Sequence, residues 1–514
     1  MYLCLIKYIH LHAKYQNLFK NMSSNNTFRQ LTDTKALVLF TLWSFLVQLF
    51  LSNDSPFFGV AHHVDSAWFF MEGKAFIIGM RPYVEFSDFK GPIIWLFYGI
   101  GYLLSPHDYH GMYVVSGVFY ALTLFFNYKT ARIFLQSDLK SLAATLPMMF
   151  VYFFPWFHFE TRSEDLMLLF VAITLYALFK RLYAEERNDK VDFMMLGGCF
   201  TVLLLMKYNI AAVQGVCVLV ALWDQYKNKR SLGLAFGWMI LISALIAIPF
   251  IIYFIMTDTL VAFFHNYFVL AYETVMNEDG GSRTMMQDVE NILEDYRKIV
   301  FITVIFLSGM LLGLRLKHYK YVPVTIALLF IAISTKHNIW HYYYGICYIF
   351  VLYLFIDILL IYNERARRIS YGVLTACLTL YCIYGNLIVG ELRLNTIFTH
   401  NGDRKAFQEL SDVMKDVKNP KLLSYECQEF GFGVMYEPIP AGEQFAYPNG
   451  GTPPMIENHR QILKDRKADF VVTYCREDQY DKKPILKEIE DAGYVLRLKR
   501  TYMNQPFYIS ERKK

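Results

Sequence analysis

Long apolar segments recur along this chain and constrain its fold more than any other feature. The segments are roughly 16 to 25 residues long, and about 20 apolar residues in an α-helix are enough to cross a bilayer. Only 18% of the 514 residues are charged, whereas soluble proteins average about a quarter. The sequence therefore predicts a polytopic α-helical membrane protein.

Basic residues in the loops set the expected orientation. Five cations precede the first span, which places the N-terminus in the cytoplasm by the positive-inside rule. The basic loops then alternate correctly if residues 91–105, which are barely long enough to span, form a helix in the outer interface. The spans predicted on this basis, about eleven in all, are 36–51, 112–128, 141–154, 166–179, 193–206, 211–223, 232–256, 299–314, 322–334, 343–362 and 371–390.

The composition becomes that of a soluble domain after residue 391. Apolar periodicity predicts helices over 405–417, 457–467 and 484–492, and strands over 422–425, 470–474, 494–498 and 507–510. This alternation favours a small α/β domain with a largely parallel sheet. We therefore divide the chain into a cytoplasmic N-terminal tail (1–34), a transmembrane domain (35–391) and an extracytoplasmic α/β domain (392–514).

Several other sequence features narrow the class of protein. The net charge of +5 comes without a basic patch of the nucleic-acid-binding kind. The glycines of the C-terminal domain do not form a GxGxxG motif, so a dinucleotide site is not predicted. Cys427 and Cys475 lie in that domain and could pair in an oxidising compartment. Either Met1 or Met22 could be the start of translation.

One loop between apolar segments concentrates ionisable groups. Residues 62–92 contain four acids, three bases and two histidines, and glycines and prolines divide them into turns. Burying an uncompensated charge at a membrane costs several kcal/mol, so such residues indicate a functional site. The alternative is a solvated loop whose charges only mark the edge of the bilayer.

The predicted topology brings three more polar clusters to the same outer side. They are residues 160–165, a long loop that holds His265, Tyr272 and Glu273, and residues 336–342. Carboxylates can act as general bases or metal ligands, and lysine or arginine can hold a phosphate. Together with Lys207, the clusters predict one outward cavity in which a phospholipid could present its head group to a water-soluble partner.

The order of these motifs resembles a known family. Asp65, Gly79-x-x-Pro82-Tyr83 and Asp88-Phe89-Lys90-Gly91-Pro92 are similar to the first outer loop of the C-type glycosyltransferases (GT-C). The similarity is to bacterial relatives of protein O-mannosyltransferases and of the aminoarabinose transferase of lipid A. It continues, over about the first 390 residues, at Glu164, at Leu205-Met206-Lys207-Tyr208-Asn209 and at His341-Tyr342.

Members of this family transfer a sugar from a polyprenyl or dolichyl phosphate carrier on the outer face of the membrane. The resemblance implies that Asp65 is the candidate base and Glu164 the acid of the second outer loop. It also implies that Lys90 contacts the carrier phosphate, with Arg81 or Lys207 as further cations. The full set of candidate substrate-binding residues is Lys90, Arg81, Asp88, Arg162, Lys207, His341 and Tyr342.

This chain departs from the family at two motif positions. Many relatives have an acidic pair where this chain has Asp65-Ser66, so a divalent metal site is left open. They have Lys-Pro-Pro where it has Lys90-Gly91-Pro92.

Each candidate also has a structural alternative. Asp65 could anchor the loop through an ion pair, and Lys90 could be a snorkelling interfacial lysine. Glu164, Asp165 and Arg162 could form an ion pair at a helix N-terminus. His341 could belong to an interfacial aromatic belt.

The resulting expectation is a glycosyltransferase of the bacterial inner (plasma) membrane. It would move a sugar from a polyprenyl-phosphate donor to a hydroxyl of a glycan, lipid or protein. One rival is a transporter or flippase of a lipid-linked sugar, although paired broken helices in two halves are not evident. The other rival is a polysaccharide ligase or polymerase that uses a diphosphate donor.

Overall fold

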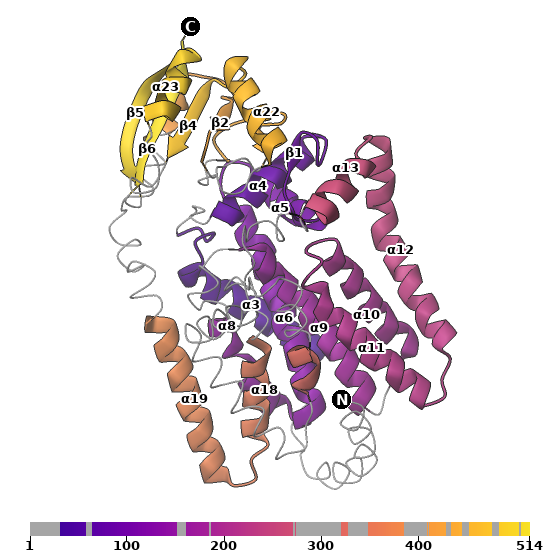
Figure 1. Cartoon of the computed structure of the whole chain (residues 1–514). Helices are drawn as coiled ribbons and strands as arrows, with labels where there is room; N and C mark the ends of the chain where they lie inside the picture. The colour runs from indigo at the N-terminus through magenta and orange to yellow at the C-terminus, as the bar shows by residue number, and fades with distance from the viewer. Residues whose placement is uncertain are drawn as a thin grey trace, which may run out of the picture.

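The computed structural model describes most of the chain as a helical bundle that carries an α/β domain at one end (Figure 1). The described residues are 31–57, 64–151, 161–184, 187–270, 273, 320–326, 348–384, 409, 411–427, 433–444, 452–474, 483–502 and 505–513.

Helices occupy the predicted spans wherever the structure describes them. Four are long and apolar enough to cross a membrane: α3 (Asp33–Leu51), α6 (His110–Leu135), α9 (Ser163–Tyr183) and α12 (Leu232–Met256). The predicted span 299–314 and most of 322–334 lie outside the described residues, so the count of eleven stays a prediction. The other helices at predicted spans are α10 (Asp189–Leu204), α11 (Ala211–Lys227), α18 (Tyr348–Leu359) and α19 (Glu364–Tyr384).

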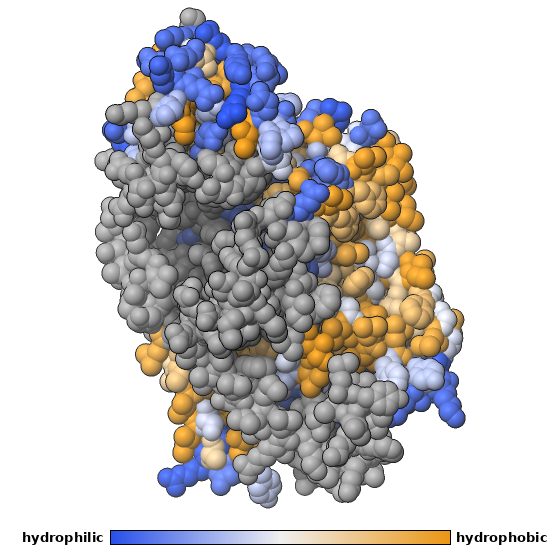
Figure 2. All heavy atoms as spheres, in the orientation of Figure 1, coloured by the Kyte–Doolittle hydropathy of each residue, from blue (hydrophilic) through white to orange (hydrophobic). Residues whose placement is uncertain are grey.

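Helix α12 shows most directly that the bundle is suited to a bilayer. Nearly all of its side chains are apolar, yet only Ala235, Met239 and Phe254 are buried in the protein. Figure 2 shows the resulting hydrophobic surface on the side of α12, with hydrophilic residues above and below it. A helix that is apolar on all sides and exposed belongs in lipid.

The predicted span 141–154 is wrong as a single helix. The structure divides the described part of this segment into α7 (Asp138–Thr145) and α8 (Met148–Val151), with Pro147 between them. Proline has no N–H to continue the hydrogen-bond ladder and its ring crowds the preceding turn. Neither short helix could cross a bilayer alone.

Two short helices lie at the end of the bundle that faces the α/β domain (Figure 1). They are α4 (Val64–Ile77) and α5 (Pro92–Leu104), which pack against each other. At 13 residues, α5 is too short to span a bilayer, and this agrees with the interfacial helix predicted over 91–105. Next to them, α13 (Leu260–Phe264) continues into the π-helix η2 (His265–Leu270).

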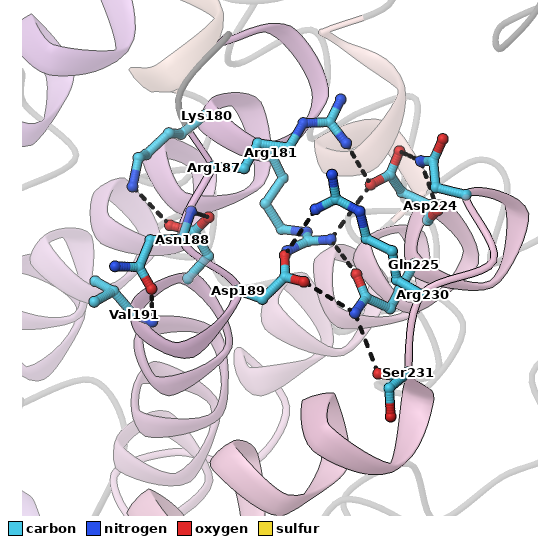
Figure 3. A network of polar contacts seen from close by, with 12 residues as sticks. Lys180, Arg181, Arg187, Asn188, Asp189, Val191, Asp224, Gln225, Arg230 and Ser231 are labelled. Carbon is cyan, nitrogen blue, oxygen red and sulfur yellow. Dashed lines mark hydrogen bonds and ion pairs between the residues drawn. The ribbon is translucent and has the colours of Figure 1, made fainter.

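A charged network joins three helices at the far end of α9 (Figure 3). The buried Arg181 of α9 pairs with Asp189 at 2.7 Å and with Asp224 of α11 at 3.4 Å, and it donates to Gln225 at 2.7 Å. Its guanidinium also lies over the ring of Phe193. Because these charges satisfy one another, the network ties α9, α10 and α11 together on the side predicted to be cytoplasmic.

The sheet of the C-terminal domain is mixed, so the prediction of a largely parallel sheet is wrong. Its order is β2 (Leu422–Ser424), β4 (Phe470–Tyr474), β6 (Gln505–Arg512) and β5 (Tyr494–Tyr502). Only β2 and β4 are parallel. Two residues separate β5 from β6, and so short a connection can join only antiparallel strands.

Helices and apolar side chains cover both faces of this sheet. Helices α22 (Pro453–Lys464) and α23 (Lys483–Asp491) contribute Ile462, Leu463 and Ile489 to one face. Met414 and Met71 pack on the other face. Since Met71 belongs to α4, the core of the α/β domain is continuous with the bundle.

Cys427 is buried three residues beyond β2, and its thiol lies 3.4 Å from the Val472 carbonyl oxygen. Ser424 of β2 pairs with Val472 of β4, an offset of 48 residues that also separates Cys427 from Cys475. Cys475 lies outside the described residues, so a disulfide between them stays a prediction.

Candidate active site

Asp65 begins the set of charged residues at the outer end of the bundle. It lies in the first turn of α4, where the helix dipole favours a negative charge, and its side chain is partly buried. Ser66, the next residue, donates from its hydroxyl to the Thr161 carbonyl at 2.8 Å. This contact holds the start of α4 against Thr161, two residues before α9.

Lys90 lies directly beside Asp88. The Lys90 Nζ is 3.2 Å from the Asp88 carboxylate, and it lies 5.3 Å from the centre of the Phe69 ring. The Asp88 side chain is 3% exposed, whereas that of Lys90 is 20% exposed. Lys90 is therefore the more exposed member of this pair.

Several carboxylates share the field of Lys90. Burial alone would lower the pKa of the Lys90 ammonium, but three nearby carboxylates hold this pKa above its ordinary range. They belong to Asp88, Asp65 and Glu164. The structure therefore brings residues from α4, from the first loop and from α9 around one lysine, which stays protonated throughout the physiological pH range.

Glu164 and Lys207 form a second ion pair in the same cluster. The Lys207 Nζ lies 2.5 Å from the Glu164 carboxylate, and their side chains are 10% and 6% exposed. Arg162 is fully buried and adds positive charge near Glu164. Its backbone N–H donates to Asp165 at 3.0 Å, which caps the start of α9, whereas Glu164 pairs with Lys207 of another segment.

Gly91 allows the two outer motifs to meet. Its N–H donates to the Met206 carbonyl at 2.9 Å, and a Cβ at this position would lie 2.0 Å from the Leu205 carbonyl oxygen. Only glycine leaves room for so close a backbone approach. A proline, which many relatives have here, would also have no N–H to donate.

The structure adds Asp54, which sequence reasoning missed. Asp54 is buried between α3 and α4 and accepts from the Thr161 N–H at 2.8 Å and from the Thr161 hydroxyl at 2.6 Å. The Tyr98 hydroxyl of α5 donates to the Thr161 carbonyl at 2.7 Å. Asp54 thus fixes the N-terminal end of α9 against the first loop, and the one sequence signal was an acid directly after a span.

Glu72 is the second residue that the candidate set omitted. It is buried in α4, and the Trp95 indole N–H of α5 donates to its carboxyl at 2.8 Å. Burial, reinforced by the neighbouring Asp88 carboxylate, raises the pKa of Glu72 well above its ordinary value. Its neutral form is therefore favoured, and this reduces the repulsion with Asp88.

Some predicted site residues are not part of this cluster in the described structure. Arg81 pairs instead with Glu85 at 3.4 Å, with 49% of its side chain exposed. His265 is exposed where α13 meets η2. His341 and Tyr342 lie outside the described residues, so their roles stay predictions.

The described residues do not group three or more His, Cys, Asp or Glu side chains in a way that could hold a metal ion. In the cluster, Asp88 pairs with Lys90 and Glu164 pairs with Lys207. His62, His63 and His158 lie outside the described residues, so a divalent metal stays a prediction.

Comparisons with known proteins give two findings. Residues 90–263 match the family described as dolichyl-phosphate-mannose-protein mannosyltransferase. The fold is similar to the crystal structure of ArnT from Cupriavidus metallidurans bound to undecaprenyl phosphate, with a TM-score of 0.57 and 11% identity. That likeness covers 92% of this chain and 97% of ArnT, so it extends past residue 390 into the α/β domain. None of the curated proteins matches the chain.

Proposed function

We propose that this chain, a membrane glycosyltransferase of the GT-C type, transfers a sugar from a polyprenyl-phosphate carrier to a hydroxyl acceptor on the outer side of the bacterial inner membrane. The observation that carries the proposal is the partly exposed side chain of Lys90 within a cluster of three carboxylates. The undecaprenyl phosphate in the similarly folded ArnT supports a donor of this chemical class.

Lys90 is the proposed contact for the carrier phosphate. An ammonium serves a phosphate as a compact point charge and needs no fork-like geometry. Its present partner, Asp88, would share the ammonium with the phosphate or yield it. We do not assign this contact to Arg81, because its guanidinium pairs with Glu85.

Asp65 is the proposed general base. The acceptor hydroxyl oxygen attacks the anomeric carbon, the bond from that carbon to the phosphate oxygen breaks, and polyprenyl phosphate leaves. Asp65 takes the acceptor proton, so charge and atoms balance. A carboxylate within reach of the acceptor hydroxyl can serve as a general base.

Glu164, Arg162 and Lys207 form the other wall of the proposed site. Lys207 neutralises Glu164 at 2.5 Å, and the buried Arg162 adds positive charge nearby. We propose that these three residues bind the polar part of the substrates. Glu164 is the alternative candidate for the general base. His341 and Tyr342 remain proposed substrate contacts on the strength of the resemblance alone.

The proposed side of the membrane makes a prediction about topology. Because the basic loops alternate along the chain, the α/β domain should be extracytoplasmic. A reporter that is active only in the cytoplasm should be silent when fused after Lys514. The same reporter fused after Lys229, in the basic loop between α11 and α12, should be active. Strong activity of the fusion at Lys514 would contradict the assignment.

The proposed reaction is tested by following the donor in proteoliposomes. Polyprenyl-phosphate-linked sugars are supplied with a mixture of hydroxyl acceptors, and free polyprenyl phosphate is measured by mass spectrometry. We expect its release to depend on the protein and on the acceptor. Consumption of a diphosphate-linked glycan alone would favour a ligase or polymerase, and movement of an intact lipid-linked sugar across the membrane would favour a flippase.

A further inference from the structure

The α/β domain reaches the first outer loop through one short strand. Strand β3 (Glu443–Gln444) pairs in parallel with β1 (Phe86–Ser87), so that Ser87 lies opposite Gln444. The Gln444 side-chain amide donates to the Val84 carbonyl at 2.9 Å. These contacts leave both residues of β3 buried against the loop.

Two further contacts attach the same domain to the bundle. The Ala441 N–H donates to the Glu85 carbonyl at 2.7 Å. The buried ammonium of Lys74, in α4, donates to the carbonyls of Gly433 at 3.1 Å and Tyr436 at 2.6 Å. Hydrogen bonds from a charged group are stronger than those between neutral groups, so this is a specific attachment.

The attachment point lies immediately before the donor-binding lysine. Strand β1 ends at Ser87, and the next residue, Asp88, pairs with Lys90. On the other side, the Gly91 N–H is held by the Met206 carbonyl. Residues 88–90 therefore lie between two backbone contacts. One is the pairing of β1 with β3 of the α/β domain, and the other is the Gly91–Met206 hydrogen bond within the bundle.

Gln444 connects the first outer loop to helix α22 of the α/β domain. The Asn458 amide of α22 donates to the Gln444 side-chain oxygen at 2.7 Å, and the Gln444 amide donates onward to the Val84 carbonyl. This orients both ends of the Gln444 side chain. A rotation of the amide, or its loss, would leave the Val84 carbonyl without this donor.

We infer that the α/β domain positions Lys90 for the carrier phosphate, and that Gln444 is the positioning residue through which it acts. The inference rests on the proposed function and gives the C-terminal domain a role in it. The position of the Lys90 ammonium relative to the phosphate matters for the rate, because a misplacement of a reacting or binding group by about 1 Å can lower the rate a hundredfold. With β3 released, Asp88 and Lys90 would lose the anchor at β1. They would keep the anchor at Gly91 and the hydrogen bond from the Tyr83 hydroxyl to the Lys90 carbonyl at 3.0 Å.

The test is the variant Gln444→Glu, which keeps the shape and the acceptor for Asn458 but removes the donor to Val84. We expect kcat/KM for the polyprenyl-phosphate sugar to fall about tenfold or more, mainly through KM for the donor, with the thermal midpoint little changed. Hydrogen exchange of a peptide covering residues 81–89 should become faster. The control is Gln461→Glu, an exposed glutamine of α22 whose amide donates to the exposed Asp465 at 2.7 Å, away from the first outer loop.

A disulfide between β1 and β3 tests whether the attachment of the loop restores activity when the Gln444 side chain is absent. In the double variant Ser87→Cys/Gln444→Cys, the two cysteines occupy paired positions of β1 and β3. We expect low activity after reduction and recovered activity after oxidation, with the crosslink verified by mass. The single variants should not respond in this way.

The outcomes separate this inference from the proposed function. If the wild type transfers sugar but Gln444→Glu is fully active, or the verified crosslink restores nothing, the positioning role is wrong. If the wild type consumes no polyprenyl-phosphate sugar, the proposed function fails. In that case, hydrogen exchange of residues 81–89 in the wild type and in Gln444→Glu still shows whether pairing with β3 orders the first outer loop.

Discussion

Replacing Asp65 with asparagine is expected to lower sugar transfer by roughly a hundredfold or more, the usual range for loss of a general base. The asparagine keeps the shape of the side chain but cannot accept the proton of the acceptor hydroxyl. Donor binding should change little, because Lys90 keeps its pairing with Asp88. Turnover and donor affinity, measured separately in detergent or proteoliposomes, check both parts of the expectation.

The control for this substitution is Glu85→Gln. Glu85 lies in the same loop, but it forms an exposed ion pair with Arg81, and such pairs contribute little. Its activity should stay near that of the wild type. Asp88→Asn is not a neutral comparison, because it removes the partner of Lys90. Full activity of Asp65→Asn would transfer the role of base to Glu164.

Replacing Lys90 with methionine is expected to weaken donor binding about tenfold to a hundredfold, since hydrogen bonds to a charged group are worth about 1.5–3 kcal/mol. Methionine keeps much of the apolar stem that packs near Phe69. Acceptor binding should be affected less than donor binding. Binding of polyprenyl phosphate, and KM for each substrate, measure the difference.

Lys190→Met is the control for a merely interfacial lysine. The Lys190 ammonium lies 4.7 Å from the centre of the Trp238 ring, at the end of the bundle away from the proposed site. It should bind the donor like the wild type. If Lys90→Met behaves in the same way, or loses donor and acceptor equally, Lys90 is an interfacial lysine and the phosphate contact is wrong.

The helices and the resemblance to a family could be predicted from the sequence because each depends on local patterns. A segment in lipid must satisfy its backbone hydrogen bonds within itself, so an apolar run of sufficient length predicts a helix, as at α12, whose predicted and observed bounds agree. The resemblance to the GT-C family rested on motifs in the outer loops. The matched family segment and the ArnT-like fold confirm it.

The mixed sheet could not be predicted from the pattern. Strand β5 lies at the edge of the sheet, and Val495 and Leu496 are 39% and 49% exposed. Its apolar alternation is therefore weak, and the predicted strand stopped at residue 498 instead of 502. The predicted strands ended at residue 498 and began again at residue 507. This apparent loop hid the two-residue connection between β5 and β6, which requires antiparallel strands.

The missing site residues depended on contacts between distant segments. Asp54 and Thr161 are 107 positions apart, and nothing near Asp54 in the sequence indicates that its carboxylate is buried. The two residues of β3 likewise carry no strand pattern, and only their pairing with β1 reveals their place beside the loop. Asp65, Lys90, Glu164 and Lys207 were proposed from the family resemblance, and the structure places them in one cluster.

An experimental structure of the protein with polyprenyl phosphate tests the central claim most directly. We predict that the phosphate lies within hydrogen-bond distance of the Lys90 Nζ, next to Asp65 and at the end of the bundle that carries the α/β domain. A phosphate bound elsewhere, for example at the Arg181 network, with Lys90 still paired only with Asp88, would contradict it.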